Sequence, residues 1–291
     1  MTKQYKVAGF ELYFPDDHQL ENYQSTWKLY DRVLSVIVKF IADKYPKMTA
    51  IDIGANVGDS AALIQEFQTI PTLCIEGNPE YLEYLYENSK IIGNIQIADC
   101  FIGSDGTYVA LDEIVSNGGT TSIVNAVVND SNNIFVSKMG SIDSLLVDFP
   151  SFKDSKFLKI DTDGFDFDII KNSQTFIKYS NPIIYFEYDI TFSEDGCVKA
   201  LSIIELLVDL GYNNFSVYDN FGNHIISLEA GDSKYFYDLT NYLLSSRYKS
   251  GQPVIYYFDI CAFVEKDSDI FKIIHSEYTL IDLNKIIGRK S

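Results

Sequence analysis

Acidic residues follow apolar runs at several points of the sequence, and the first of these runs also leads into two glycines. Residues 51–58 are IDIGANVG, and a second apolar run ends at Glu76. Two later runs end in DTDG at 161–164 and in EYD at 187–189. Ligands of open α/β sheets bind beyond the carboxyl ends of the strands. These residues are therefore the ones expected to bind a cofactor and to do chemistry.

The loop from Gly54 to Gly58 suits a nucleoside ligand that has no phosphates. Gly54 permits a sharp turn at the strand end, and Gly58 removes a side chain that would block a ligand over the next helix N-terminus. Dinucleotide folds prefer G-x-G-x-x-G, whereas this loop is G-x-x-x-G after Asp52 and lacks the middle glycine. A ligand that presents an amino acid end to the loop fits better.

Glu76 lies 22 residues after Gly54, close to the roughly 20-residue offset at which an acid meets a ribose diol. A carboxylate at that point can accept hydrogen bonds from both ribose hydroxyls. Either the glycine pair or Glu76 alone would be weak evidence for a nucleoside site, because tight turns need glycine and strand ends often have Glu. Together, in a strand, turn, helix and strand context, they predict a nucleoside cofactor.

The elements that position these residues alternate between short apolar runs and helical patterns, which is typical of a parallel sheet wrapped by helices. The predicted strands are 49–54, 71–77, 94–104, 156–161, 183–188, 214–227 and 253–265. The last two are expected to form an antiparallel hairpin at the end of the sheet, with a short helix between them. The other predicted helices are 60–67, 79–91, 141–146, 167–177, 200–212 and 268–283.

Residues 1–47 are predicted to form an extension to a single domain that spans 48–291. Residues 5–15 alternate like a hairpin, and 25–45 have apolar residues at helical spacing, among them Trp27 and Tyr30. Residues 104–140 have weak periodicity and predict an irregular excursion. Its GGTTSI segment is expected near the mouth of the site, as a contact or a lid.

The composition indicates an ordinary folded protein, with 46% hydrophobic and 22% charged residues. The net charge of −18 would repel a phosphate backbone, so nucleic acid is not an expected partner. Four cysteines without a C-x-x-C pair favour free buried thiols over zinc or disulfides.

The N-terminus does not have the form of a signal peptide, and no window approaches the roughly 20 apolar residues needed to cross a bilayer. We therefore expect a soluble, cytoplasmic protein without a membrane span. The sequence leaves a homo-oligomer open.

The chain resembles the FkbM family of S-adenosylmethionine-dependent methyltransferases. The stretches with this resemblance are, in the family's order, AIDIGANVGDSAALI, LCIEGNPEYLEYL, IGSDGTYVAL, SIDSLL, FLKIDTDGFDFDIIKNS and IIYFEYD. They cover about residues 48 to 190, roughly half of the chain. The resemblance implies a Rossmann-like class I methyltransferase fold with a seven-stranded, mostly parallel sheet whose last strand is antiparallel. It also implies O-methylation of a hydroxyl on a sugar, glycan or secondary metabolite.

The resemblance implies cofactor contacts at three loops. The methionine end is expected near Asp52, Gly54, Ala55, Asn56 and Gly58. The ribose and adenosine are expected near Glu76, Gly77 and Asn78, and the adenine near Asp99, Cys100 and Phe101. Two positions depart from the family pattern, because Asp163-Gly164 stands where Glu-Gly is frequent, and Gly77 replaces the usual Pro.

Methyl transfer to oxygen needs an aligned hydroxyl and a base. Asp161 is expected to face the cationic cofactor, and Asp163 or Glu187 to take the acceptor proton or to hold the substrate. Some of these acids could instead only cap the helix near Phe165. His224 is a further candidate base, with a polar turn residue as the alternative, while His18 and His275 are expected at the periphery.

The three carboxylates could also bind Mg²⁺, but the sequence has no full metal motif, so no metal site is predicted. The leading hypothesis is an O-methyltransferase with a small-molecule or glycan substrate. A module that binds S-adenosylmethionine without turnover is the alternative from another class, and it would have no acceptor pocket around Asp163. An NAD-dependent oxidoreductase would require a pyrophosphate loop that 54–58 does not provide.

Overall fold

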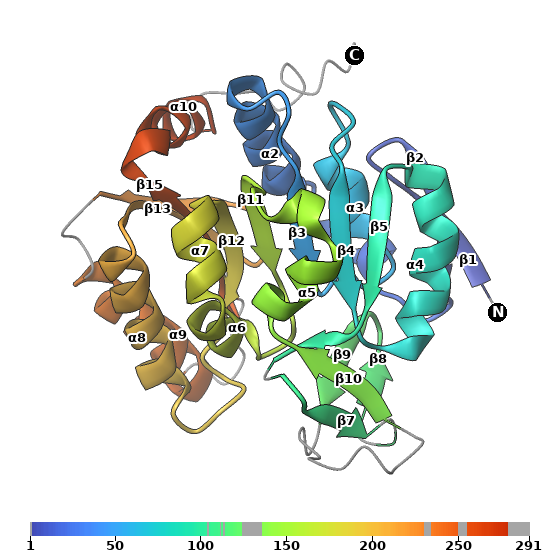
Figure 1. The fold of residues 1–291 in the computed structure, drawn as a ribbon. Helices are drawn as coiled ribbons and strands as arrows, with labels where there is room; N and C mark the ends of the chain where they lie inside the picture. The colour runs from blue at the N-terminus through green and yellow to red at the C-terminus, as the bar shows by residue number, and fades with distance from the viewer. Residues whose placement is uncertain are drawn as a thin grey trace.

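A mixed sheet of eight strands forms the centre of this computed structural model (Figure 1). The structure describes residues 2–103, 105–110, 112, 114–123, 136–229, 234–249 and 255–278. From edge to edge, the strand order is β14, β13, β15, β12, β11, β3, β4 and β5. The bounds of these strands are Ala50–Ile53 (β3), Thr72–Glu76 (β4), Ile95–Asp99 (β5), Phe157–Ile160 (β11), Ile183–Tyr188 (β12), Tyr212–Asp219 (β13), His224–Leu228 (β14) and Phe258–Val264 (β15).

The pairing within this sheet confirms the predicted α/β class. Strands β3, β4, β5, β11 and β12 pair in parallel, and β15 runs antiparallel to both of its neighbours, β12 and β13. Segment 214–227, expected as one strand, folds instead into β13 and β14, because the chain reverses at a turn in which Gly222 has φ +82°. The hairpin strand β14 therefore adds an eighth strand at the sheet edge to the seven expected.

Helices cover both faces of the sheet, and each face has its own buried apolar cluster. The helices of one cluster are α5 (Ile142–Asp148), α6 (Asp166–Asn172), α7 (Gln174–Ser180), α8 (Gly196–Asp209) and α9 (Tyr235–Lys249). Those of the other are α2 (Arg32–Lys44), α3 (Asp59–Ile64), α4 (Pro79–Ile92) and α10 (Ser268–Tyr278). Two short 3-10 helices, η2 (Pro150–Phe152) and η3 (Glu265–Asp267), precede β11 and α10.

The N-terminal residues form the predicted hairpin, but not the predicted single helix. Strands β1 (Thr2–Val7) and β2 (Phe10–Pro15) pair in antiparallel fashion, and Leu12 packs in one cluster with residues of α4. The helix expected over 25–45 is two helices, α1 (Leu20–Thr26) and α2, because Asp31 adopts a left-handed conformation with φ +58°. Trp27 and Tyr30 therefore lie outside the helix to which the spacing assigned them.

The excursion at 104–140 contains short strands in its described part. They are β7 (Tyr108–Ala110), β8 (Ile114–Asn117), β9 (Thr120–Ile123) and β10 (Val136–Gly140), and residues 124–135 lie outside the description. Strand β10 pairs with β7 and with β6 (Phe101–Ile102), while β8 and β9 form a separate hairpin. In Figure 1 these strands lie below β3, β4 and β5, at the end where the parallel strands finish. Pairs this short repeat too few residues to produce a periodic pattern in the sequence.

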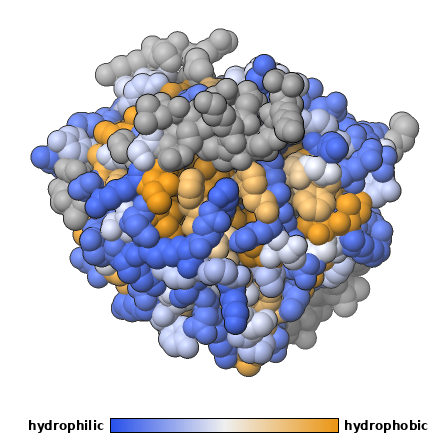
Figure 2. Space-filling view, turned by 90° about the horizontal axis from the view of Figure 1, so that it is seen from above, coloured by the Kyte–Doolittle hydropathy of each residue, from blue (hydrophilic) through white to orange (hydrophobic). Residues whose placement is uncertain are grey.

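The opposite end of the molecule is the one seen in Figure 2. Hydrophilic residues cover much of its visible periphery, and apolar residues gather toward its middle. All four cysteines are free thiols, and Cys74, Cys100 and Cys261 are buried, as predicted. Among the described helices, none has the length and apolar character that crossing a membrane requires.

Candidate functional site

The turn after β3 brings two loops into close contact at the carboxyl ends of the central strands. Gly54 has φ +75°, and a Cβ atom built on it would lie 1.8 Å from the backbone oxygen of Asp161. Gly58 has φ +93°, and its absent side chain leaves room for Leu85 of α4. Gly54 is therefore required by the neighbouring loop, and Gly58 by the packing of α3 against α4.

Glu76, the last residue of β4, organises the loops around it through its carboxylate. Its Oε2 accepts a hydrogen bond from the backbone N–H of Asn56 at 2.8 Å. Its Oε1 accepts from the N–H groups of Gly77 at 2.9 Å and Asn78 at 2.7 Å. Burial raises the pKa of Glu76, while these three donors act in the opposite direction. A carboxylate has about four acceptor positions, so about one is left for a ligand.

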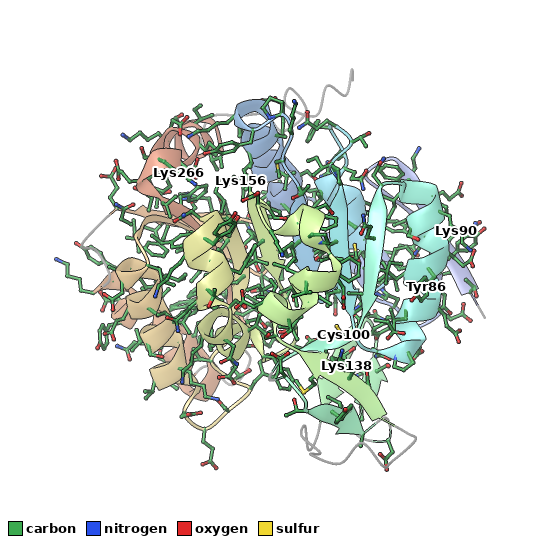
Figure 3. The ribbon with its side chains drawn as sticks, in the orientation of Figure 1. Tyr86, Lys90, Cys100, Lys138, Lys156 and Lys266 are labelled. Carbon is green, nitrogen blue, oxygen red and sulfur yellow. The ribbon has the colours of Figure 1, made fainter. Side chains whose placement is uncertain are left out.

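The first cavity lies beside Glu76 and has a volume of about 580 Å³. Its walls are largely apolar and come from β3, β4, the segment after β5 and α6, and they include Ile75, Cys100, Phe101 and Phe165. A Cβ atom on Gly77 would lie 2.4 Å from the Phe101 ring, so this glycine is what lets the ring lie against the loop. Figure 3 shows Cys100 near the lower end of the sheet, with Lys138 of β10 beside it, and Lys156 and Lys266 at the other end.

A buried lysine links the cofactor loop to the loop after β11. Lys159 lies opposite Asp52 in the parallel register, with its Nζ 3.4 Å from Asp52 Oδ1 and 3.1 Å from Asp161 Oδ2. Asp52 is fully buried and also accepts a 2.6 Å hydrogen bond from the Ser60 hydroxyl. Burial alone would lower the pKa of Lys159, but the charges of Asp161 and Asp52 raise it, so the lysine stays a cation.

The second cavity adjoins the first, has a volume of about 1670 Å³, and is strongly acidic. The two cavities share the residues Gly54, Asn56, Asp161 and Asp163. The carboxylates that line the second cavity are Asp31, Asp59, Asp161, Asp163, Glu187 and Asp259, and among its described lining residues Lys159 is the only Lys or Arg.

Burial and mutual repulsion raise the pKa values of these acids. Desolvation and the neighbouring Asp161 charge raise the pKa of Asp163 to about 7. Desolvation and the charges of Asp59 and Asp161 raise that of Asp31 to about 8. Desolvation and the charges of neighbouring carboxylates, Asp161 first among them, also raise the pKa of Glu187 well above its usual range. At neutral pH, Asp163 therefore exchanges readily between its protonated and ionised forms.

The hairpin of β8 and β9 closes one side of the site, as expected for GGTTSI. The backbone N–H of Thr121 donates to Asp163 Oδ2 at 2.8 Å, and the Asn56 amide donates to the carbonyl of Gly119 at 2.6 Å. The Asn78 amide, which also caps α4, donates to the hydroxyls of Ser116 and Thr121 at 2.9 and 3.0 Å. Hydrogen bonds thus connect the hairpin to the cofactor loop, to the loop after β4 and to Asp163.

The sequence matches the Methyltransferase FkbM domain over residues 52–213, more than half of the chain. The chain belongs to the FkbM methyltransferase family. Its cofactor is S-adenosylmethionine, as predicted. No curated protein matches the sequence.

Several solved methyltransferase structures are similar to this FkbM-family chain. The methyltransferase FkbM from Methylobacillus flagellatus KT has 16% identity and a TM-score of 0.39 over 75% of the chain, which spans 44% of that protein. A putative O-methyltransferase from Klebsiella pneumoniae has 10% identity and a TM-score of 0.42, with 88% and 84% of the two chains covered. An O-methyltransferase from Bacillus cereus in complex with SAH has 10% identity and a TM-score of 0.41, with 86% and 92% covered.

The residues around the first cavity fit S-adenosylmethionine. The free acceptor position on Glu76 suits a ribose hydroxyl, and the apolar walls around Phe101 suit a purine. Asp161 and Asp163 line both cavities, and carboxylates stabilise cations such as a sulfonium or an ammonium group.

The structure brings together most, but not all, of the residues predicted for this FkbM site. The predicted residues that line one or both cavities are Gly54, Asn56, Glu76, Gly77, Cys100, Phe101, Asp161, Asp163 and Glu187. Those that line neither cavity are Asp52, Ala55, Gly58, Asn78, Asp99 and His224. Asp52 contacts the cavity residue Lys159, and Asn78 donates hydrogen bonds to the hairpin of β8 and β9, so both support the cavity walls without lining them. His224 lies on the edge strand β14, 2.9 Å from the Ser227 hydroxyl, so the structure does not support it as the base.

The helix-capping alternative is not supported, because the N-cap of α6, Phe165, has no side-chain cap hydrogen bond. Asp166, in the first turn of α6, accepts hydrogen bonds from the hydroxyl of Thr162 at 2.8 Å and from its backbone N–H at 3.2 Å. Burial and the Asp161 charge raise the pKa of Asp166 to about 6. Asp161 and Asp163 are therefore left to face the cavities.

Sequence reasoning missed several residues of the second cavity. They are His18, Tyr23, Asp31, Lys159, Tyr185, Phe221, Tyr257 and Asp259. Trp27 and Tyr30, which were expected within a helix, also line this cavity. A usable signal existed for Lys159, because a lysine inside a fully buried parallel strand needs an acidic partner. His18, expected at the periphery, is buried, and the side chain of His275 lies outside the description. Among the described residues, no group of three or more His, Cys, Asp or Glu could hold a metal ion.

Proposed function

We propose that the protein transfers a methyl group from S-adenosylmethionine to a hydroxyl of a sugar, glycan or other small metabolite, with Asp163 as the general base. One observation supports this most directly. Asp163 lines both cavities, so it lies between the cofactor side and the acceptor side, and its pKa is raised to about 7. A base of that pKa is well matched to proton removal at neutral pH.

S-adenosylmethionine, when bound, supplies an electrophilic methyl carbon on a sulfonium. Asp163 would accept the proton that the acceptor hydroxyl loses when its oxygen is methylated. The Thr121 N–H holds the Asp163 carboxylate in place, since it donates to Oδ2 at 2.8 Å. Asp161 is fixed by Lys159 and places a negative charge beside the cationic reactant. Glu76 and the apolar walls orient the nucleoside.

Asp161 is a weaker candidate for the base. It also lines both cavities, but its side chain is 52% exposed and its Oδ2 lies 3.1 Å from the Lys159 ammonium. The Asp161 carboxylate is therefore already engaged in an ion pair. Within the described residues, no Lys or Arg forms an ion pair with Asp163.

The second cavity also argues against the alternative functions. A module that only binds S-adenosylmethionine has no need of a further cavity around Asp163, and the loop at 54–58 still lacks the middle glycine of dinucleotide sites. The acidic lining disfavours nucleic acid as the acceptor, because it would repel phosphates. The cytoplasmic location and the oligomeric state stay predictions.

Replacement of Asp163 by Asn tests the proposal. Asp163→Asn should reduce the turnover rate at saturating S-adenosylmethionine by about 10² to 10⁴-fold. The assay incubates the protein with S-adenosylmethionine and a panel of hydroxylated acceptors, and detects products by a mass increase of about 14 and the methyl position by NMR. Asp168→Asn is the matched control, since Asp168 lies in α6 but pairs with Lys199 at 3.6 Å outside both cavities. Unchanged turnover in Asp163→Asn would remove it as the base.

A further inference from the structure

The charge of the second cavity is not balanced by the protein itself. Six carboxylates line it, and the one lysine in its described lining, Lys159, is already shared between Asp52 and Asp161. Asp161 and Asp163 also line the first cavity and so face the positive charges of the cofactor. Glu187 and Asp259 line only the second cavity, where the acceptor must enter.

Glu187 and Asp259 face each other across two strands. They are paired residues in the antiparallel register of β12 and β15, so their side chains leave the same face of the sheet at neighbouring points. Glu187 is 8% exposed, and its Oε2 is buried without a hydrogen-bond partner in the described part of the chain. Like charges directly opposite are unfavourable, and a buried polar atom without a partner costs stability. A ligand that brings a positive hydrogen-bond donor would remove both penalties.

Aromatic side chains from three separate segments also line this cavity. They are Tyr23, Trp27, Tyr30, Phe221, Tyr256 and Tyr257. The rings of Trp27 and Phe221 stack with centroids 4.5 Å apart, so one from the N-terminal segment and one from the turn after β13 form a joint surface. Aromatic faces attract cations and also pack against the apolar faces of sugar rings.

We propose that the methyl acceptor has a protonated amine in addition to its hydroxyl, as an amino sugar has, and that the amine binds between Glu187 and Asp259. The statement that this ligand is the methyl acceptor rests on the proposed function, whereas the binding of an amine between Glu187 and Asp259 does not. Burial, together with nearby carboxylates, raises the pKa values of both groups well above their usual ranges, and an ammonium between them would let them ionise. An anionic acceptor, such as a phosphorylated sugar, would oppose the ionisation of both groups and would form no ion pair with them.

Trp27 provides a direct measurement, because it is the only tryptophan of the chain and it lines the cavity. The protein is loaded with S-adenosylhomocysteine, and Trp27 fluorescence is titrated with matched probes that differ only in the amine. The pairs are glucosamine with N-acetylglucosamine, and kanamycin with its fully N-acetylated form. At least one amine is expected to bind tenfold or more tightly than its acetylated partner, and the preference should weaken at high salt.

Two isosteric variants locate the effect. Asp259→Asn and Glu187→Gln should each reduce the amine preference at least fivefold, while S-adenosylhomocysteine affinity and the thermal unfolding midpoint show that the fold and the cofactor site are kept. Glu83→Gln, an exposed acid on α4, should leave the preference unchanged. Equal affinity within both pairs, including no measurable affinity for any member, would overturn the proposal. So would an amine preference that both variants retain.

Methyl transfer is measured separately on the amine that binds. Transfer to one of its hydroxyl oxygens supports both proposals. Amine-selective binding without any methyl transfer would contradict the proposed function and leave the binding inference standing. A methyl group found on the nitrogen would overturn the inference, since the amine would then be the acceptor and not the group that positions it.

Discussion

Asp163→Asn should stabilise the free protein while it abolishes most of the activity. The carboxylate lies between the two cavities, where burial and the Asp161 charge oppose its ionisation. Asn has nearly the same shape and keeps a carbonyl oxygen for the Thr121 N–H, but it cannot ionise. The substitution therefore removes the cost of a buried charge without removing the contact that holds the loop.

The size of the gain follows from the pKa difference between the folded and unfolded chains. An unfolded Asp has a pKa of about 3.9, and Asp163 in the folded protein has one of about 7. Because the folded value is the higher one, the folded state keeps its proton longer, and stability falls as pH rises from about 4 to 7. At about 1.36 kcal/mol per unit, ionisation costs about 4 kcal/mol at pH 7.5 and about 2 kcal/mol at pH 5.5.

Urea unfolding at these two pH values is the appropriate assay. We expect Asp163→Asn to be more stable than the wild type by about 2 to 4 kcal/mol at pH 7.5, and the gain to fall by about half at pH 5.5. Glu83→Gln changes the net charge equally at an exposed position and should have little effect at either pH. A variant less stable than the wild type at pH 7.5, or a gain independent of pH, would refute the reasoning.

Three other substitutions test the parts that hold the cofactor loop. Glu76→Gln should weaken S-adenosylmethionine binding by about 1 to 3 kcal/mol in calorimetry, because one charged acceptor oxygen becomes a donor, and an unchanged affinity would remove Glu76 from the site. Lys159→Met should lower the free energy of unfolding by about 3 to 5 kcal/mol, because Asp52 stays buried without its cation; a loss below 1 kcal/mol would contradict this. Gly54→Ala should destabilise far more than Gly93→Ala. Both glycines have φ near +75°, but only at Gly54 would the new Cβ collide with the backbone, so similar losses would contradict the close approach.

The sequence was sufficient to predict the parallel strands and the strand ends that line the first cavity. Strands β3, β4, β11 and β12 are continuous buried runs, and their ends place Gly54, Glu76 and Asp161 at one edge. Parallel strands finish at a common edge, so residues distant in the chain can be assigned to one site from their positions alone.

The acceptor side could not be predicted, because its walls come from segments without a shared pattern. Trp27 and Tyr30 have helical spacing, but the left-handed Asp31 ends that pattern and turns the segment toward the cavity. Asp259 lies in a strand, and its partner Glu187 is known only once the register of β12 and β15 is known. The role of Gly58 in helix packing likewise depends on Leu85, which no local pattern connects to it.

The raised pKa of Asp163 also predicts that cofactor binding is coupled to proton release. At pH 7 a group with a pKa of about 7 is roughly half protonated, and a cation placed beside it favours the ionised form. S-adenosylmethionine, whose sulfonium is positive, should therefore release up to roughly half a proton at pH 7. S-adenosylhomocysteine has a neutral sulfur and should release less. Calorimetric titrations in two buffers with different ionisation enthalpies measure both values, with Asp163→Asn as the control that should remove the difference. Equal proton release by the two ligands in the wild type would mean that Asp163 does not face the sulfonium, and a different carboxylate would then have to be the base.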